Sequence, residues 1–152
     1  MNTVIFACIQ NAGRSQMAAA FFEQFANPAF ARAISAGTRP AARVHPEVVD
    51  VMREVGRDLS GAIPTLLTPE LAAGAAWLIT MGCGDECPVV PGMRRDDWLL
   101  PDPAGQSAER VREIRDEIKD RVWRFIAAQG WWKLRPALSD EAPSASGEHP
   151  PR

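Results

Sequence analysis

The stretch Cys8–Ser15 restricts the fold of this chain more than any other, because it joins two apolar segments of different character. The segment before it, Thr3–Ala7, is short, β-branched and almost entirely apolar, as is typical of a strand buried on both faces. The segment after it, Gln16–Phe25, is rich in alanine and phenylalanine, which predicts a helix with one apolar face. Cys8–Ser15 is therefore expected to be a loop between the end of a strand and the start of a helix.

A loop in that position can bind an oxyanion. The first N–H groups of a helix have no partner within the helix and attract anions, and Gly13 allows the loop to curl so that further amides point inward. Arg14 can hold two oxygens of a tetrahedral anion with its planar guanidinium. Cys8 shares this electropositive setting, which favours the thiolate, a nucleophile. The alternative is a buried structural cysteine beside a surface arginine.

Composition indicates one domain, which we place at residues 1–134 of the 152. Residues 135–152 are rich in proline, serine, alanine and acidic side chains, and we expect a disordered tail there. A formal net charge of -2 gives no reason to expect nucleic acid or an anionic membrane as a partner. Since no apolar run approaches the roughly 20 residues that span a bilayer and no secretory signal is recognisable, we expect a cytoplasmic protein.

The remaining segments continue an alternation of strands and helices. Ala31–Ala36 is expected to be the second strand, which completes a βαβ unit and predicts a parallel sheet. His45 comes just before the next helix and is better explained by capping or packing than by catalysis. The charged residues of the last helix predict a solvent-facing side. We expect the further helices and strands at Pro46–Val55, from Thr68 onward, at Ala75–Met81, at Trp98–Leu100 and at Ser107–Gln129.

Cys83 and Cys87 follow the strand expected at Ala75–Met81. The chain has 3 cysteines, and an odd number in a reducing compartment suggests chemistry rather than a disulfide framework. Because the carboxyl ends of parallel strands meet at one edge of a sheet, these two thiols are expected near Cys8. Three interpretations are open: half of a metal site, two incidental buried thiols, or a redox pair. We favour the redox pair, since zinc-ligand spacing is absent and a loop rich in glycine and acidic residues is a poor place to bury thiols.

The loop Cys8–Ser15, with a strand before it and a helix after it, resembles the phosphate-binding loop of the low-molecular-weight protein tyrosine phosphatase family. The segment Met81–Pro88, with Trp98 and Asp102–Gly105 beyond it, looks like the arsenate reductase branch of that family, which works by disulfide exchange. The resemblance spans roughly residues 3–128. It implies an α/β three-layer sandwich with a four-stranded parallel sheet flanked by helices and the phosphate-binding loop after the first strand.

The resemblance also implies roles for single residues. Asp102 would be the general acid that protonates the leaving oxygen, although an aspartate beside proline is also common in turns. Ser35 would hydrogen-bond Asn11 and, with Ser15, support the loop. No metal and no bound cofactor are expected. The oxyanion would be bound by Ile9, Gln10, Asn11, Ala12, Gly13, Arg14 and Ser15.

For an arsenate reductase, the implied reaction starts with attack of Cys8 on arsenate, assisted by Asp102. Cys83 then attacks Cys8 and releases arsenite, and Cys87 attacks Cys83 to leave a Cys83–Cys87 disulfide. Thioredoxin would reduce that bond by thiol–disulfide exchange. Mycothiol or another small thiol is the alternative donor, because the spacing between Cys83 and Cys87 is shorter than in the thioredoxin-linked members that this chain resembles.

Two alternative functions stay open at this point. A tyrosine phosphatase would need Cys8 and Asp102 but neither Cys83 nor Cys87, and a reductase of this kind is expected to keep some phosphatase activity. A non-enzymatic arsenite or metal binder or sensor would use all the cysteines without turnover. Arsenate reduction is favoured because three thiols are expected at one edge of the sheet.

Overall fold

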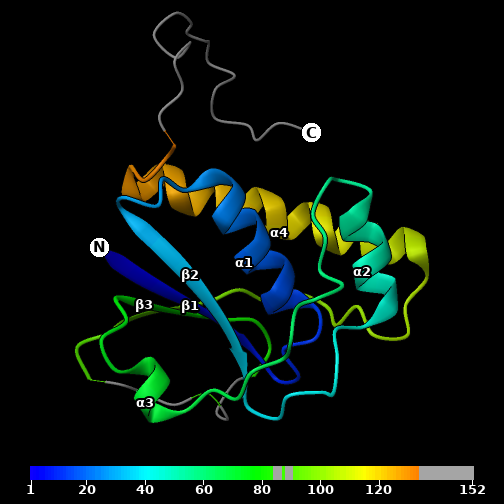
Figure 1. The fold of residues 1–152 in the computed structure, drawn as a ribbon, viewed down its shortest axis with the longest axis horizontal. Helices are drawn as coiled ribbons and strands as arrows, with labels where there is room; N and C mark the ends of the chain where they lie inside the picture. The colour runs from blue at the N-terminus through cyan, green and yellow to red at the C-terminus, as the bar shows by residue number, and fades with distance from the viewer. Residues whose placement is uncertain (84–86, 88–90, 134–152) are drawn as a thin grey trace, which may run out of the picture.

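In the computed structural model, which describes residues 1–83, 87 and 91–133, a four-stranded sheet carries helices on both faces (Figure 1). The elements in chain order are β1 (Asn2–Cys8), α1 (Arg14–Phe25), β2 (Ala31–Gly37), α2 (Pro46–Arg53), α3 (Pro69–Ala72), β3 (Trp77–Thr80), β4 (Arg94–Asp97) and α4 (Ala108–Gln129). The strand order is β2-β1-β3-β4, and every neighbouring pair is parallel. Figure 1 shows α1, α2 and α4 on one side of the sheet and α3 on the other, so the predicted three-layer α/β sandwich is confirmed.

β1 lies inside the sheet because its side chains are apolar on both faces. Val4, Ile5, Phe6 and Ala7 have 0% exposure. Their side chains alternate, so that Val4, Phe6 and Cys8 belong to the core under α1, α2 and α4, whereas Ile5 and Ala7 belong to the smaller core beside α3. Burial on both faces explains why this strand shows no polar alternation in the sequence.

The register of the strands places two loops side by side. Ala7 pairs with Thr80 across β1 and β3, and Cys8 pairs with Gly37 across β1 and β2. The N–H of Met81 donates to the carbonyl of Ala7 at 2.7 Å. The segments that follow β1 and β3 therefore leave the same edge of the sheet, where parallel α/β folds place their ligand sites.

The fourth strand differs from the prediction. It is Arg94–Asp97, at the edge of the sheet, and the predicted strand Trp98–Leu100 lies after it. The charged residues suit an edge strand, and Asp97 accepts a hydrogen bond from the Thr80 hydroxyl on β3. In the predicted segment Trp98 and Leu100 are buried whereas Leu99 is exposed, and the Trp98 ring packs against Phe6, with 5.8 Å between ring centroids.

Local signals set most helix ends. The Thr68 side chain accepts a backbone N–H at 3.0 Å at the start of α3, and Ser107 does the same at 3.1 Å at the start of α4. Gly130 ends α4 in the left-handed conformation, with φ 75°. Two elements are shorter than predicted, since α2 ends at Arg53 and β3 spans Trp77–Thr80.

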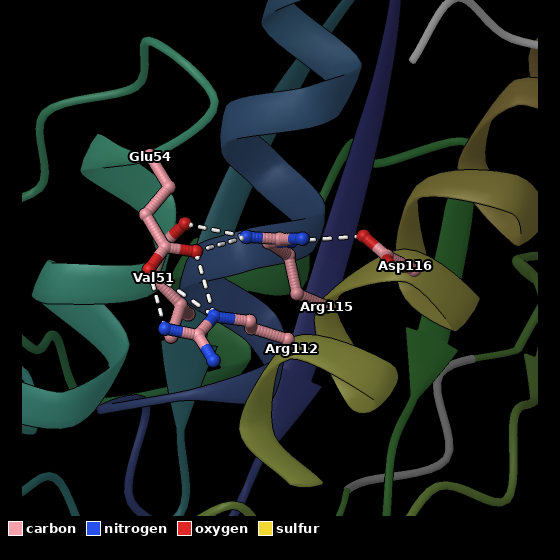
Figure 2. A network of polar contacts seen from close by, with 5 residues as sticks. All are labelled: Val51, Glu54, Arg112, Arg115 and Asp116. Atoms are coloured by element: carbon pink, nitrogen blue, oxygen red, sulfur yellow. Dashed lines mark hydrogen bonds and ion pairs between the residues drawn. The ribbon is translucent and has the colours of Figure 1, made fainter. Parts of the chain in front are cut away.

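Figure 2 shows the polar contacts that fasten α2 to α4. Arg112 donates to the Glu54 carboxylate from Nε, at 3.0 and 3.2 Å to its two oxygens, and from Nη2 at 2.9 Å, and these hydrogen bonds hold the pKa of Glu54 below its ordinary value. Arg115 donates to Glu54 and to the Val51 carbonyl, both at 2.9 Å, and contacts Asp116 (Figure 2). Arg115 and Lys119 are only 8% and 7% exposed, so the predicted solvent-facing side of this helix is wrong at both positions.

The predicted disordered tail, residues 135–152, lies outside the described residues, as do residues 84–86 and 88–90 of the segment between β3 and β4. The domain boundary at residue 134 stays a prediction for the same reason. Among the helices that the structure describes, none is long and apolar enough to cross a membrane.

Candidate active site

The loop between β1 and α1 curls around a small pocket. Asn11 takes the left-handed conformation, with φ 50°, and α1 begins directly afterwards at Arg14. Cys8 is a free cysteine that is 2% exposed. The pocket has a volume of about 160 Å³ and is lined by Cys8, Ile9, Gln10, Ala12, Gly13, Arg14, His45 and Asp102. Most of the residues predicted to bind the oxyanion therefore surround one cavity.

A hydrogen-bond chain points toward the Cys8 sulfur. Sγ of Cys8 lies 2.9 Å from Oγ of Ser15, and either atom is able to donate. The Asn11 amide donates to the same Ser15 oxygen at 2.7 Å. Because that oxygen already accepts from Asn11, its own hydrogen is available to Cys8. Ser15 therefore links Asn11 to Cys8 within the loop.

The predicted hydrogen bond between Ser35 and Asn11 is not among those of the described residues. Asn11 Oδ1 accepts instead from the backbone N–H of Thr65 at 2.8 Å and from Gln16 Nε2 at 3.2 Å. Ser35 lies within β2 and pairs with Phe6. Thr65 lies at the end of that strand, where its carbonyl accepts the N–H of Gly37. Asn11 is therefore held from outside the loop by Gln16 of α1 and by Thr65, and the Thr65 donor is a backbone group that carries no sequence signal.

Arg14 and Asp102 meet at the wall of the pocket. Arg14 Nη2 lies 3.9 Å from Asp102 Oδ2, and Nη1 donates to the carbonyl of Leu100 at 3.0 Å. The Asp102 side chain is 56% exposed, and its Oδ1 accepts the N–H of Ala104 at 3.0 Å. Pro103 packs over Gly13, where a β-carbon would lie 2.8 Å from the proline ring. The segment after β4 therefore closes over the Cys8 loop and brings a carboxyl group to its mouth.

Cys83 and Cys87 form a disulfide, with 5.7 Å between their Cα atoms. They are 4% and 2% exposed, so the expectation that this segment is a poor place to bury thiols is wrong. Both pack with Leu67 and Leu78 in the core beside α3, whereas Cys8 belongs to the core on the other face of the sheet. In this oxidised arrangement the pair lies at the same sheet edge as Cys8 but is turned to the opposite face.

His45 is a pocket residue that the sequence interpretation left out. It begins α2 as expected, but its side chain also lines the cavity with Cys8 and Asp102. The signal in the sequence is only the position before Pro46, and many histidines precede helices without lining a site. Among the described residues, no group of at least three His, Cys, Asp or Glu side chains is arranged to hold a metal ion.

Comparison with known proteins agrees with this geometry. Residues 3–130 match the family model of low molecular weight phosphotyrosine protein phosphatase. A putative arsenate reductase of Halobacterium salinarum is 42% identical over 121 residues, which cover 77% of this chain and 85% of that protein. A glutaredoxin arsenate reductase of Synechocystis sp. is 36% identical over 130 residues, which cover 84% of this chain and 98% of that protein.

Solved structures include a thioredoxin-dependent arsenate reductase of Corynebacterium glutamicum, which is similar with a TM-score of 0.72 and 37% identity. The match covers 85% of this chain and 63% of that chain, which is less than two thirds of its length. The structural match shows that the two chains share a fold over the aligned region.

Proposed function

Because the chain belongs to the low molecular weight phosphotyrosine protein phosphatase family, we propose that it is an arsenate reductase, an enzyme that converts arsenate to arsenite. The observation that carries the proposal is the Cys83–Cys87 disulfide at the sheet edge that also holds the Cys8 pocket. A phosphatase has no use for these two thiols, whereas a reductase that works by disulfide exchange ends its turnover with them joined. The arsenate reductases among the similar proteins favour this function over the tyrosine phosphatase.

In the first step, arsenate enters the pocket and the Cys8 thiolate attacks the arsenic atom. The loop amides and Arg14 bind the oxygens, and Asp102 supplies the proton with which one oxygen leaves as water. Ser15 and Asn11 hold the sulfur and the loop in place through the hydrogen-bond chain described above. The product of this step is a covalent adduct of Cys8 and arsenic, which is still As(V).

In the second step, the Cys83 thiolate attacks the Cys8 sulfur and a Cys8–Cys83 disulfide forms. The sulfur–arsenic bond breaks, its electron pair stays on arsenic, and arsenite leaves as As(III). Cys87 then attacks Cys83, so that Cys8 returns to a thiolate and Cys83–Cys87 carries the two oxidising equivalents. The structure corresponds to this last state, with Cys8 free and the other pair bonded.

The cascade requires Cys83 to move between two positions. To react with Cys8 it must bring its Cα within about 7 Å of the Cα of Cys8, whereas in the oxidised state it packs on the α3 side of the sheet. Gly82, with φ 97°, precedes Cys83 and permits a change of direction of the backbone at this point. We infer that the reduced segment lies closer to the pocket than the oxidised one.

A thiol donor must then reduce Cys83–Cys87, and we propose thioredoxin, with mycothiol or a glutaredoxin as alternatives. The similar proteins include one called a thioredoxin-dependent arsenate reductase and one called a glutaredoxin arsenate reductase, and these names support both donors as candidates for this chain. Such donors act in a reducing compartment, which supports a cytoplasmic location. Slow hydrolysis of aryl phosphates is expected as well, since the same thiolate and acid serve that reaction.

The test is arsenate-dependent oxidation of NADPH by the purified protein with thioredoxin and thioredoxin reductase. Cys83→Ser and Cys87→Ser are expected to abolish multiple turnover while phosphate binding survives, and Cys8→Ser to abolish both reduction and covalent capture of the oxyanion. Absence of arsenate-dependent NADPH oxidation with each of thioredoxin, glutaredoxin and mycothiol as the donor would reject the proposal. Aryl phosphate turnover without arsenate reduction would support the phosphatase, and stoichiometric arsenite binding without turnover would support a binder or sensor.

A further inference from the structure

We propose that the imidazole of His45 contacts the bound oxyanion and determines which substrates fit, so that the pocket takes a free inorganic oxyanion rather than an aryl or peptide ester. The inference rests on the proposed function and names the substrate class of that same pocket. It concerns a side chain outside the loop and outside the cysteine cascade. Three features of the molecule support it: how His45 is held, what surrounds its imidazole, and how small the cavity is.

His45 is held at the pocket by its backbone. Its N–H donates to the carbonyl of Ala12 at 3.0 Å, which ties the start of α2 directly to the phosphate-binding loop. Its carbonyl accepts from Val48 at 2.9 Å and from Val49 at 3.1 Å, which closes the first turn of the helix. Both structural roles belong to backbone groups that any residue except proline supplies at this position. The side chain is therefore not needed to form the cap.

The imidazole lies over the loop and has no hydrogen-bond partner among the residues that the structure describes. A β-carbon placed on Gly13 would be 3.7 Å from Cδ2 of His45, so the ring lies beside the loop glycine. The ring is half-buried and lines the same cavity as Cys8. Ring nitrogens that are neither capping the helix nor bonded to another side chain are available to an oxygen in the pocket.

Charged side chains of both signs lie around the ring. Arg14 lies on the loop side of the cavity and Asp102 on the side of the segment after β4. Arg43 and Glu47 are close to His45 in the sequence, and Glu47 Oε2 accepts the N–H of Gly105 at 3.3 Å rather than a hydrogen from the imidazole. An oxyanion bound by the loop would thus present its outward oxygens to His45 and Asp102, and imidazole is able to donate a hydrogen bond in either protonation state.

The size of the cavity supports selection for a small substrate. Its volume is about 160 Å³, whereas pockets for drug-sized molecules occupy roughly 300–1,000 Å³. His45 and Asp102 both line this cavity, so these two side chains limit the space for a group attached to the bound anion. Removal of the imidazole would both delete a hydrogen bond to the anion and widen the mouth.

The experiment measures binding of inorganic phosphate to the reduced protein by calorimetry, together with kcat/KM for an aryl phosphate. His45→Ala is expected to raise the Kd for phosphate about tenfold, as for loss of one hydrogen bond to a charged group, and to raise kcat/KM for the aryl phosphate. His45→Gln, whose amide also donates, is expected to bind phosphate within about threefold of the wild type. The matched control is His149→Gln, which removes the other histidine of the chain and is expected to change neither quantity.

A purely structural role for His45 predicts a different result. All three variants would then bind phosphate with the wild-type Kd, or His45→Ala and His45→Gln would lose affinity equally together with melting temperature; either outcome overturns the inference. Should His45→Ala not fold, His45→Asn keeps the backbone cap with a shorter amide, and an unchanged Kd and unchanged ester turnover in that variant would also overturn it. Phosphate binding needs no disulfide cascade, so failure of arsenate reduction alone leaves the role of His45 intact.

Discussion

Gly82 lies against the guanidinium of Arg14. A β-carbon at Gly82 would overlap Nη1 of Arg14 and lie 3.2 Å from its Cζ, and the glycine has φ 97°, a conformation that other residues rarely adopt. The same guanidinium donates to the carbonyl of Leu100, on the segment that leads to Asp102. Arg14 is therefore held between the residue before Cys83 and the segment that leads to Asp102.

The first prediction concerns this contact. Gly82→Ala is expected to push the guanidinium out of position and to weaken phosphate binding by roughly tenfold or more, the effect of losing charge-assisted hydrogen bonds. Gly92→Ala is the matched control, because Gly92 has φ 84° but no atom within 4 Å of its would-be β-carbon. Calorimetry on both variants separates the contact from backbone strain. Equal phosphate Kd values for the two variants would show that the overlap with Arg14 has no effect.

The second prediction concerns Asp102. Asp102→Asn is expected to lower kcat for aryl phosphate hydrolysis and for arsenate reduction by about 10²-fold or more, because the leaving oxygen loses its proton donor. Phosphate binding is expected to stay equal or tighten, since a carboxylate that repels the anion is replaced by a neutral amide. Steady-state kinetics measures kcat, and calorimetry on the same preparation measures the Kd for phosphate. An Asp102→Asn enzyme with wild-type kcat would remove this residue from the mechanism.

The third prediction concerns the order of thiol exchange. Cys87→Ser is expected to stop after one turnover, with one equivalent of arsenite released and Cys8 joined to Cys83, because no thiol remains to resolve that bond. Mass spectrometry of peptides under non-reducing conditions identifies the pair. The matched variant Cys83→Ser is expected to leave Cys8 without that partner. Finding Cys8 unpaired after arsenate treatment of Cys87→Ser would contradict the proposed sequence.

The fourth prediction concerns stability and pH. Arg112 and then Arg115 lower the pKa of Glu54 from 4.5 in the folded protein, so this carboxylate stabilises the fold fully above pH 4.5 and loses its effect as the pH falls through the folded value. Glu54→Gln is expected to lower the melting temperature by a few degrees at pH 7, with a difference that shrinks in acid. The control is Glu113→Gln, which removes an exposed pair with Arg110. A Glu54→Gln difference that stays constant with pH would exclude the ion pairs as its cause.

The parts of this fold that depend on neighbours in the chain could be predicted from the sequence. The strand before Cys8, the helix at Arg14 and the helix caps at Thr68, Ser107 and Gly130 all follow from signals within a few residues. The predicted position of the fourth strand was wrong. Apolar residues indicate that a segment is buried, but they do not distinguish a strand paired in the sheet from a loop whose side chains pack against the core. Trp98 is buried by packing, whereas the charged strand Arg94–Asp97 pairs with β3 at the sheet edge.

By itself, the sequence determined that a cysteine and an arginine flank one loop between a strand and a helix, since chain connectivity fixes that arrangement. Only the tertiary structure decided that Thr65 supports Asn11, that His45 lines the pocket, and that Cys83 and Cys87 are buried on the far face of the sheet. Each of these depends on segments distant in the sequence that meet through strand register and helix packing. A local sequence pattern does not predict such long-range contacts, because the position of the contacting residue is set by the fold as a whole.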